Sequence, residues 1–361
     1  MNPSKPAVPG GSPGTIAVIG AGAVGGYVGG RLAAAGHDVV LLDAWAEHVR
    51  AINQLGLIIS EPGIRYTVAV PAVHTADLSV LKGRQFDAVF VCVKLYDTDW
   101  ALRLILPYLR DDSCVITLQN SLVEGEVAAL VGWHRTLGCI GSGMYVGLDG
   151  PGHVQRNKRP SKGGAPVFYI GEARGEPSSR VESLAAMLAE VDVTEVTKNL
   201  WGMRWAKLVA NTMTSGLGGA LDMGLKQLFG EPRCRRLMTR LASEAIAVGA
   251  ALKYRTENVF GLPAQVWADA NARHATALEA IDQVFDRQHE IVTEEAVPGT
   301  LQDLRKGKPT EVEYMNGFVA AKGADVGVPA PLHAALADII RQIERGRSTP
   351  GVAHLQSMET L

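Results

Sequence analysis

The chain has 361 residues, of which 47% are hydrophobic and 20% are charged, and its formal net charge is −2. This composition is that of a globular protein with room for two domains, which excludes disorder as the main state. Lys and Arg are scattered along the chain and show no excess, so we expect small-molecule partners and no nucleic acid. No apolar run reaches the roughly 20 uncharged residues of a membrane span, and the start lacks the apolar core of a signal peptide.

The cysteines predict a cytoplasmic location. They lie mostly in apolar runs, and none has the spacing of a metal ligand set or a CxxC pair. We interpret them as core thiols in a reducing cytosol, and we expect no metal site. These cysteines are Cys92, Cys114, Cys139 and Cys234.

Residues 1–13 are rich in Pro, Gly and Ser and are expected to form a flexible tail. In residues 14–198, short apolar runs alternate with amphipathic segments, which predicts a parallel sheet with helices on its faces. The alternation begins with "TIAVIG", "GGYVGGRLAAAG" and "HDVVLLD". We expect the later stretches "TLGCIGSGMYVGLDGPGHVQRN" and "APVFYIGE" to extend the same sheet.

A glycine-rich turn follows the first strand. Gly20, Gly22 and Gly25 form G-x-G-x-x-G at the start of a helix, and Asp43 ends the next strand. In that context the three glycines allow a tight turn, close approach of a pyrophosphate and close packing of the helix on the strand. The motif therefore predicts a dinucleotide site formed by Gly20, Ala21, Gly22, Ala23, Val24 and Gly25.

Asp43 bears on the choice of nucleotide. A carboxylate at this position accepts hydrogen bonds from the ribose hydroxyls of NAD and repels the 2′-phosphate of NADP, and no arginine follows directly. NAD(H) is therefore favoured. In the alternative, Asp43 caps the helix that follows, Arg50 reaches the phosphate, and NADP(H) is the cofactor.

Lys94 and Asn120 end two further apolar strands. The carboxyl ends of parallel strands meet at one edge of a sheet, where ligands of such folds bind, so both residues are candidate cofactor contacts. From their sequence context alone, ordinary solvation of a loop explains them equally well.

Residues 199–348 carry apolar residues at helical spacing and predict an all-α domain. Within it, residues 263–295 are predicted to be helical and to cover part of a cleft. Residues 349–361 are expected to form a loose tail. The predicted fold class is thus an N-terminal α/β Rossmann-like dinucleotide-binding domain (14–198) followed by an all-α C-terminal domain.

One helix of the second domain carries a polar stripe. Lys207, Asn211 and Ser215 follow one another at intervals of four residues, on one face. Without other information, the lysine stem could lie along the core with its ammonium in solvent, and the asparagine could satisfy backbone groups. Glu311 follows Pro309 and Thr310 at an expected helix start, where a negative charge is favourable in any case.

Over nearly its whole length the chain resembles the ketopantoate reductase family. The likeness rests on the glycine motif and on "FVCVKLYDT", "LQNSLVEGE", "WAKLVANTMTSGL" and "LQDLRKGKPTEVEYMNG", in the family's order. It implies a substrate cleft between the two domains and the reduction of 2-dehydropantoate, or a related 2-oxo acid, by a nicotinamide cofactor. The chain departs from the pattern at Ser121, where the family usually has glycine.

The resemblance also implies roles for individual residues. Lys207 corresponds to the catalytic lysine, which donates a proton to the ketone oxygen, and Asn211 hydrogen-bonds the substrate. Glu311 orients the reacting hydroxyl and the cofactor ribose and balances the charge of Lys207. Lys94 and Asn120 contact the nicotinamide half of the cofactor.

The substrate side differs from the family pattern. The serine that contacts substrate falls on Gly299, or on Thr300 after a one-residue shift, and the second asparagine of the stripe falls on Ser215. We therefore expect a 2-oxo acid bulkier than 2-dehydropantoate to be preferred. The alternatives are a D-2-hydroxy acid dehydrogenase for branched or aromatic substrates and a nicotinamide-binding regulatory protein without turnover. The sequence leaves the oligomeric state open, a homodimer included.

Overall fold

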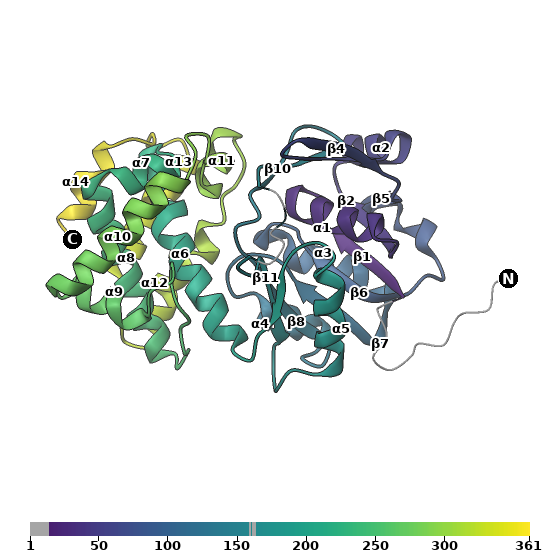
Figure 1. Ribbon diagram of the computed structural model, residues 1–361, viewed down its shortest axis with the longest axis horizontal. Coiled ribbons are helices and arrows are strands. Elements are labelled where there is room, and N and C mark those ends of the chain that lie inside the picture. The colour runs from purple at the N-terminus through teal and green to yellow at the C-terminus, as the bar shows by residue number, and fades with distance from the viewer. Residues whose placement is uncertain (1–13, 159, 161–163) are drawn as a thin grey trace. The chain divides into compact units, whose positions relative to one another are not determined.

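Figure 1 shows a computed structural model of the protein, which describes residues 14–158, 160 and 164–361. The tail expected over residues 1–13 lies outside this range. The chain divides into two compact units, one up to Leu200 and the other from Trp201 to Leu361. The first unit is α/β and the second is helical, which confirms the predicted fold class.

The first unit is built on an eight-stranded sheet with the order β12-β11-β8-β7-β6-β1-β2-β5. Neighbouring strands are parallel, except for the antiparallel pair of β8 and β11. The strands are β1 (Thr15–Ile19), β2 (Asp38–Asp43), β5 (Ala72–His74), β6 (Phe86–Val91), β7 (Leu109–Thr117), β8 (Thr136–Gly141), β11 (Phe168–Glu172) and β12 (Thr194–Val196).

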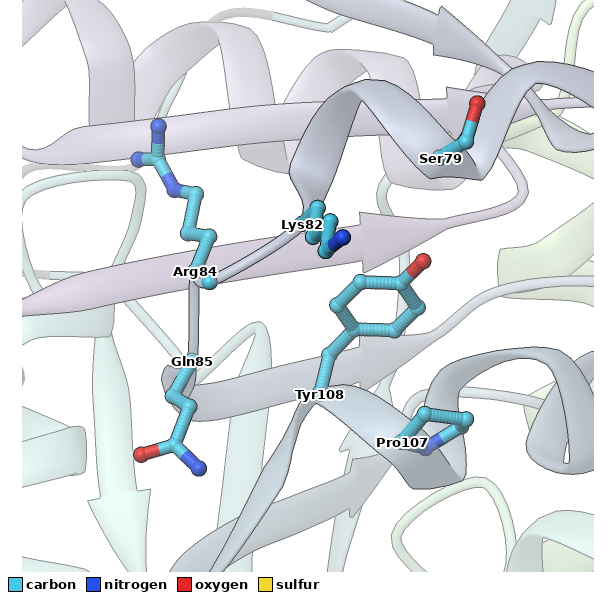
Figure 2. A pocket seen from close by; sticks show the side chains of 7 residues that line it. Ser79, Lys82, Arg84, Gln85, Pro107 and Tyr108 are labelled. Carbon is cyan, nitrogen blue, oxygen red and sulfur yellow. The ribbon is translucent and has the colours of Figure 1, made fainter.

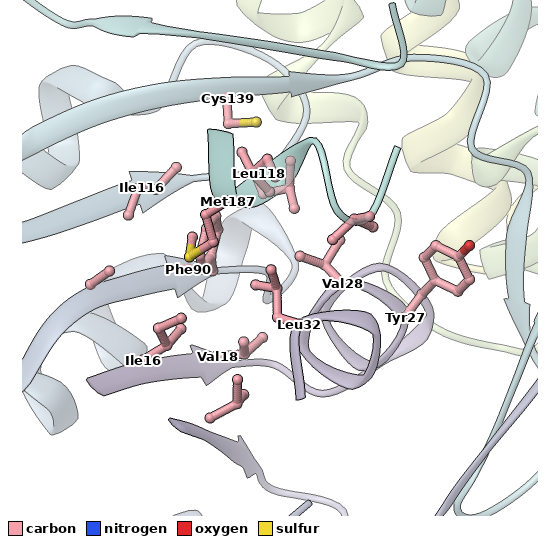
Figure 3. Packing of buried hydrophobic residues seen from close by; sticks show 14 of the residues in the cluster. Ile16, Val18, Tyr27, Val28, Leu32, Phe90, Ile116, Leu118, Cys139 and Met187 are labelled. Carbon is pink, nitrogen blue, oxygen red and sulfur yellow. The ribbon is translucent and has the colours of Figure 1, made fainter. Parts of the chain in front are cut away.

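Helices connect most of these strands, as the alternation of patterns predicts. They are α1 (Ala23–Ala34), α2 (Ala46–Leu55), α3 (Thr98–Ile105), α4 (Glu124–Val131) and α5 (Ser179–Leu188), with 3₁₀ turns at Thr75–Leu81, Leu95–Asp97 and Leu106–Tyr108. Because parallel strands are covered on both faces, β1 is apolar and buried from Ile16 to Ile19. Figure 3 shows side chains of one face gathered around Val18, Phe90 and Ile116, with Leu32 of α1 among them.

A second sheet of four strands has the order β4-β3-β10-β9. It contains β3 (Leu57–Glu61), β4 (Ile64–Val68), β9 (Val146–Leu148) and β10 (His153–Arg156). The prediction that the whole stretch from β8 to β11 extends the main sheet is therefore wrong for β9 and β10. β11 occupies the edge of β8, whereas β10 pairs in parallel with β3.

Helix α1 packs against both sheets through glycines. A Cβ atom placed on Gly29 would lie 2.5 Å from Leu41 Cδ2 of the main sheet, and one on Gly30 would lie 2.7 Å from Leu57 Cδ2 of the second sheet. Because a residue larger than glycine would force these leucine side chains to shift, the close packing of α1 extends beyond the G-x-G-x-x-G motif. This packing fixes the helix whose first turn faces the predicted pyrophosphate site.

The second unit consists of α-helices and short turns. Its elements are α6 (Leu200–Leu221), α7 (Leu225–Gly230), α8 (Pro232–Ala251), α9 (Ala264–Asn271), α10 (Ala275–Ile291), α11 (Gly299–Arg305), the 3₁₀ turn η4 (Val312–Tyr314), α12 (Asn316–Asp325), α13 (Pro331–Glu344) and α14 (Ala353–Glu359). Trp205 of α6 is fully buried and donates its ring N–H to the carbonyl of Ala245 in α8 at 2.9 Å. The core of this unit therefore includes one face of α6.

Residues 263–295 are mainly helical, as predicted, and form two helices, α9 and α10, because the chain turns between them at Arg273, whose φ is +63°. One sequence prediction for this unit is wrong. The segment 349–361, expected to be a loose tail, contains α14. Its side chains Leu355 and Met358 are buried, and Glu359 pairs with Arg233 at 2.6 Å. Within the described part of the chain, no helix is long and apolar enough to cross a membrane.

Candidate functional site

The glycine loop between β1 and α1 is tightly held on its inner side. Gly20 has φ +90°, and a Cβ atom there would lie 2.6 Å from the backbone nitrogen of Val93. A Cβ atom on Gly25 would lie 2.0 Å from the carbonyl oxygen of Gly20. Gly22, the N-cap of α1, is different, because a Cβ atom there would meet nothing within 4 Å and no side chain caps the helix. The loop is thus open at the position where an anion would meet the N–H groups of the first turn.

His48 of α2 holds this loop in place. Its side chain is fully buried, Nε2 lies 2.9 Å from the carbonyl oxygen of Ala21, and Nδ1 lies 2.9 Å from the backbone nitrogen of Gly152. A neutral ring with its proton on Nε2 satisfies both contacts, by donating to Ala21 and accepting from Gly152. Sequence reasoning missed this residue, because its partners come from the glycine motif and from the distant turn before β10.

Asp43 is half-buried at the end of β2. Its Oδ1 accepts a hydrogen bond from the backbone N–H of Trp45, the N-cap of α2, at 2.8 Å. The carboxylate therefore fixes the turn before α2, but it does not cap the helix as the alternative interpretation expected, because no side chain among the described residues accepts from the N–H groups of its first turn. The bond engages only one carboxylate oxygen, and Oδ2 forms no hydrogen bond or ion pair within the part of the chain that the structure describes. Arg50 lies exposed on α2.

The loops that carry Lys94 and Asn120 are joined at one edge of the main sheet. The Nε2 group of Gln119 donates to the carbonyl oxygen of Val93 at 2.9 Å and to Oγ1 of Thr98 at 2.8 Å. Lys94 is half-buried and Asn120 is exposed. Since Gly20 also approaches Val93, the structure brings the ends of β1, β6 and β7 together, as the strand-end argument predicts.

Ser121, the departure from the family pattern, has φ +61°. This is the left-handed region, which costs a residue with a side chain about 1–2 kcal/mol relative to glycine. Ser121 therefore adopts a backbone conformation that favours glycine.

On α6, the polar stripe lies beside fully buried apolar side chains. Lys207 and Asn211 are half-buried, whereas Leu208 and Val209 are fully buried. Burial lowers the pKa of Lys207 from its ordinary value of 10.5. No hydrogen bond or ion pair of Lys207 is recorded within the described residues, so its ammonium is held in a site that weakens its hold on a proton.

The third residue of the stripe meets α11. The Oγ atom of Ser215 accepts a hydrogen bond from the backbone N–H of Thr300 at 3.0 Å and lies 3.0 Å from Thr300 Oγ1. A Cβ atom on Gly299 would lie 3.7 Å from Ser215 Oγ, which is ordinary contact. The structure thus brings Ser215, Gly299 and Thr300 together, with the two hydroxyls engaged by one another.

Glu311 and Glu313 differ sharply in their surroundings. Glu311 is 8% exposed and precedes the 3₁₀ turn η4 without a hydrogen bond from its side chain to that turn. Glu313 is exposed and forms an ion pair with Arg341 at 2.5 Å, and this hydrogen-bonded partner lowers the pKa of the Glu313 carboxyl. Of the two, Glu311 is the candidate for a role inside a site.

A buried polar network behind α6 was not predicted. Asn316 Nδ2 donates to the carbonyl oxygen of Thr212 at 3.1 Å and lies 3.2 Å from Nδ1 of His333. His333 Nε2 lies 2.9 Å from the carbonyl oxygen of Leu241, and burial lowers the pKa of His333 to about 4. A neutral imidazole therefore links α6 and α12 to α8 and α13.

A pocket of about 390 Å³ lies in the first unit, away from the predicted residues. Figure 2 shows Lys82, Arg84, Gln85 and Tyr108 around it. These residues precede β6 or β7, whereas Lys94 and Asn120 follow those strands. The pocket therefore opens at the opposite edge of the sheet, and we assign it no role in the site. Among the described residues, no cluster of His, Cys, Asp and Glu side chains could hold a metal ion.

Comparison with known proteins defines the class. A glycine loop that joins a strand of a parallel sheet to a helix is the architecture of a dinucleotide-binding domain. Residues 16–167 match the family described as "Ketopantoate reductase PanE/ApbA", and residues 199–344 match its C-terminal part. A 2-dehydropantoate 2-reductase of Pyrococcus horikoshii is 27% identical over 330 residues, which cover 91% of this chain and 97% of that protein.

Solved structures agree with this assignment. A PanE/ApbA family ketopantoate reductase from Ralstonia eutropha JMP134 is 27% identical, with a TM-score of 0.75 over 92% of this chain and 99% of that one. A D-mandelate dehydrogenase, solved with NADH and anilino(oxo)acetate, shares the fold at 23% identity, with a TM-score of 0.76 over 92% of this chain and 99% of that one. The chain belongs to the ketopantoate reductase family and is an oxidoreductase of that family, which confirms the resemblance.

Proposed function

We propose that this oxidoreductase reduces the ketone of a 2-oxo acid to a 2-hydroxy acid with NADH. The observation that carries the proposal is Lys207, a half-buried lysine whose pKa burial lowers, on the polar stripe of α6 in a reductase-family chain. A lysine that holds its proton weakly is suited to act as a general acid near neutral pH. A protein that only senses nicotinamide has no need of such a group.

The first unit has the features needed to hold the cofactor. The open space at Gly22 and the uncapped first turn of α1 suit a pyrophosphate, and Oδ2 of Asp43 suits a ribose hydroxyl. Lys94 and Asn120, at the same edge of the sheet, are the proposed contacts to the nicotinamide half. When bound, reduced nicotinamide supplies the hydride that the ketone carbon receives.

The second unit supplies the proton. In the proposed reaction, the Lys207 ammonium donates a proton to the ketone oxygen as the new C–H bond forms, and the resulting amine regains a proton from solvent. Glu311, almost entirely buried, orients the reacting hydroxyl and offsets the charge of Lys207. Asn211, one turn along α6, donates a hydrogen bond to the substrate.

On the substrate side, we propose a preference for a branched or aromatic 2-oxo acid over 2-dehydropantoate. Ser215 and Thr300 are hydrogen-bonded to each other, and Gly299 has no side chain. This part of the site therefore offers few hydrogen-bonding groups to a substrate hydroxyl. A site without such partners discriminates weakly in favour of a hydroxyl and accepts a larger apolar group. The second candidate function is therefore that of a D-2-hydroxy acid dehydrogenase.

The test is steady-state kinetics under identical NADH, with 2-dehydropantoate compared with branched-chain and phenyl-substituted 2-oxo acids. We expect a bulkier acid to have the higher kcat/KM. A preference for 2-dehydropantoate of more than about tenfold would identify a ketopantoate reductase in the strict sense. Binding of NADH without turnover of any acid would favour the regulatory alternative.

We also propose a cytoplasmic location. All four cysteines are free thiols, and Cys114, Cys139 and Cys234 are buried, as expected in a reducing compartment. A homodimer remains a prediction, which light scattering of the purified protein would test.

A further inference from the structure

An exposed tryptophan stands beside the carboxylate proposed to bind the ribose. Trp45 is 39% exposed, although it lies next to the first turn of α2. Its indole stacks on the imidazole of His48, with 5.3 Å between ring centroids and an interplanar angle of 6°. Because His48 is fully buried and both of its ring nitrogens are engaged, the indole rests on a fixed surface.

The backbone of Trp45 is fixed as well. Its N–H donates to Oδ1 of Asp43 at 2.8 Å. The carboxylate that would accept a ribose hydroxyl therefore also fixes the backbone position of Trp45. Two residues of extended chain span at most about 7 Å. In a nucleoside, the base is attached to the carbon next to the one that bears the 2′-hydroxyl. A base whose ribose binds Asp43 therefore lies within reach of the indole.

A single exposed apolar side chain is common on protein surfaces and by itself needs no explanation. Trp45 differs from Ile64 on β4, another exposed apolar residue of the first unit, because the Trp45 ring stacks on His48 and the Trp45 backbone is bonded to Asp43. Flat aromatic rings held in this way are the surfaces on which nucleobases stack.

We propose that Trp45 forms the stacking surface for the adenine ring of the cofactor. This inference rests on the proposed function, because it requires a dinucleotide at the glycine loop. His48 acts as a positioning residue for the adenine and the pyrophosphate of the ligand. Its imidazole stacks on the Trp45 indole and also bonds to Ala21 of the glycine loop.

The experiment measures dissociation constants by calorimetry for NADH, ADP-ribose and reduced nicotinamide mononucleotide. The proteins are the wild type, Trp45→Ala, Trp45→Phe and the control Ile64→Ala. We expect Trp45→Ala to weaken NADH and ADP-ribose by about tenfold and to leave the mononucleotide, which has no adenine, unchanged. Trp45→Phe should stay within about threefold of the wild type, because a smaller aromatic face remains, and Ile64→Ala should match the wild type.

Three results would overturn the inference. Unchanged affinity of folded Trp45→Ala for NADH would show that the base does not stack there. Equal weakening of all three ligands would show that Trp45 only supports the glycine loop through His48. Failure of the wild type to bind NADH, NADPH or ADP-ribose would refute the proposed function itself and the inference with it. If Trp45→Ala fails to fold, Trp45→Leu, which keeps apolar bulk without an aromatic face, decides the matter by the same ligands.

Discussion

The hydroxyl of Ser215 on α6 accepts a hydrogen bond from the backbone N–H of Thr300, in the first turn of α11, at 3.0 Å. Pro298, the N-cap of α11, has no side-chain group that could accept this bond. A residue of one helix therefore supplies a hydrogen-bond acceptor to the first turn of another, and the same contact engages the Ser215 hydroxyl.

Replacing Ser215 with Ala should therefore affect stability more than substrate binding. The variant leaves the N–H of Thr300 buried without a partner, so the free energy of unfolding should fall by about 1–3 kcal/mol. KM for the 2-oxo acid should change less than about threefold. Urea denaturation and steady-state kinetics measure the two effects, with the exposed Ser357→Ala as control. A tenfold rise in KM at unchanged stability would instead show that Ser215 binds substrate.

Lys207→Ala should separate binding from chemistry. Loss of a general acid should lower kcat by roughly 10²–10⁴, whereas Kd for NADH should stay within about twofold. Single-turnover kinetics and calorimetry provide the two readouts. Lys322→Ala, which removes a half-exposed lysine paired with Asp325, is the matched control and should behave as the wild type. Normal turnover by folded Lys207→Ala would move the search for the proton donor to Lys94.

The pH profile of the wild type should report the pKa of Lys207. Reduction needs the protonated ammonium, so kcat/KM should fall as pH rises through that pKa. Burial places this fall below 10.5, the ordinary value for lysine. Oxidation of the 2-hydroxy acid needs the neutral amine, so its rate should rise over the same range. The Lys207→Arg variant should show neither the fall in the reduction rate nor the rise in the oxidation rate, because guanidinium keeps its proton throughout this pH range. A limb that persists in that variant would belong to another group.

Asp43 should favour NADH over NADPH. Its carboxylate opposes a 2′-phosphate, so the Kd for NADH should be lower in the wild type. Asp43→Asn should narrow this preference while its side-chain oxygen still accepts from the N–H of Trp45. Calorimetry with both nucleotides checks the two expectations. If NADPH binds the wild type tenfold more tightly, a difference of about 1.4 kcal/mol, Asp43 only supports the turn before α2. Arg50 then becomes the candidate for binding the 2′-phosphate.

His333 should make the fold sensitive to acid. Burial lowers its pKa from 6.5 to about 4, so between these values the unfolded chain binds a proton that the folded protein does not. The free energy of unfolding should therefore decrease as pH falls from about 6.5 to about 4, by about 3 kcal/mol in total, and then level off. Urea denaturation across this range, compared with His333→Gln, isolates the effect. Identical slopes for the two proteins would assign the acid sensitivity to other groups.

Local patterns were sufficient to predict much of this molecule. The alternation of strand and helix, the glycine turn and the polar stripe of α6 each depend on residues close together in sequence, and the fold class follows from them. The roles of Lys207 and Glu311 came from family motifs. They remain predictions, although the lowered pKa of Lys207 and the burial of Glu311 are consistent with them.

What the sequence could not predict depends on distant partners. In the four-stranded second sheet, β3 pairs with β10, although β6, β7 and β8 lie between them in the sequence. These strands are short, and their residue patterns do not indicate which strand each one pairs with. His48 gains its role only when Ala21 and Gly152 meet around it. The sequence "STPG" predicts a loose end of the chain. Instead, Leu355 and Met358, which lie one turn apart on α14, are buried in the core.

Glycines of α1 pack against strands that are synthesised at different times, so this packing depends on how much of the chain has been made. Gly30 lies against Leu57 and Ile59 of β3, and Gly26 lies against Val154 of β10, which emerges from the ribosome only after most of the main sheet. Until then, one edge of β3 has no partner, and α1 lacks part of its cover. Pairing across such a separation in the chain is slow, and an open strand edge invites association with other chains. A fragment cut before residue 153 should therefore aggregate, however complete its nucleotide motif is in sequence.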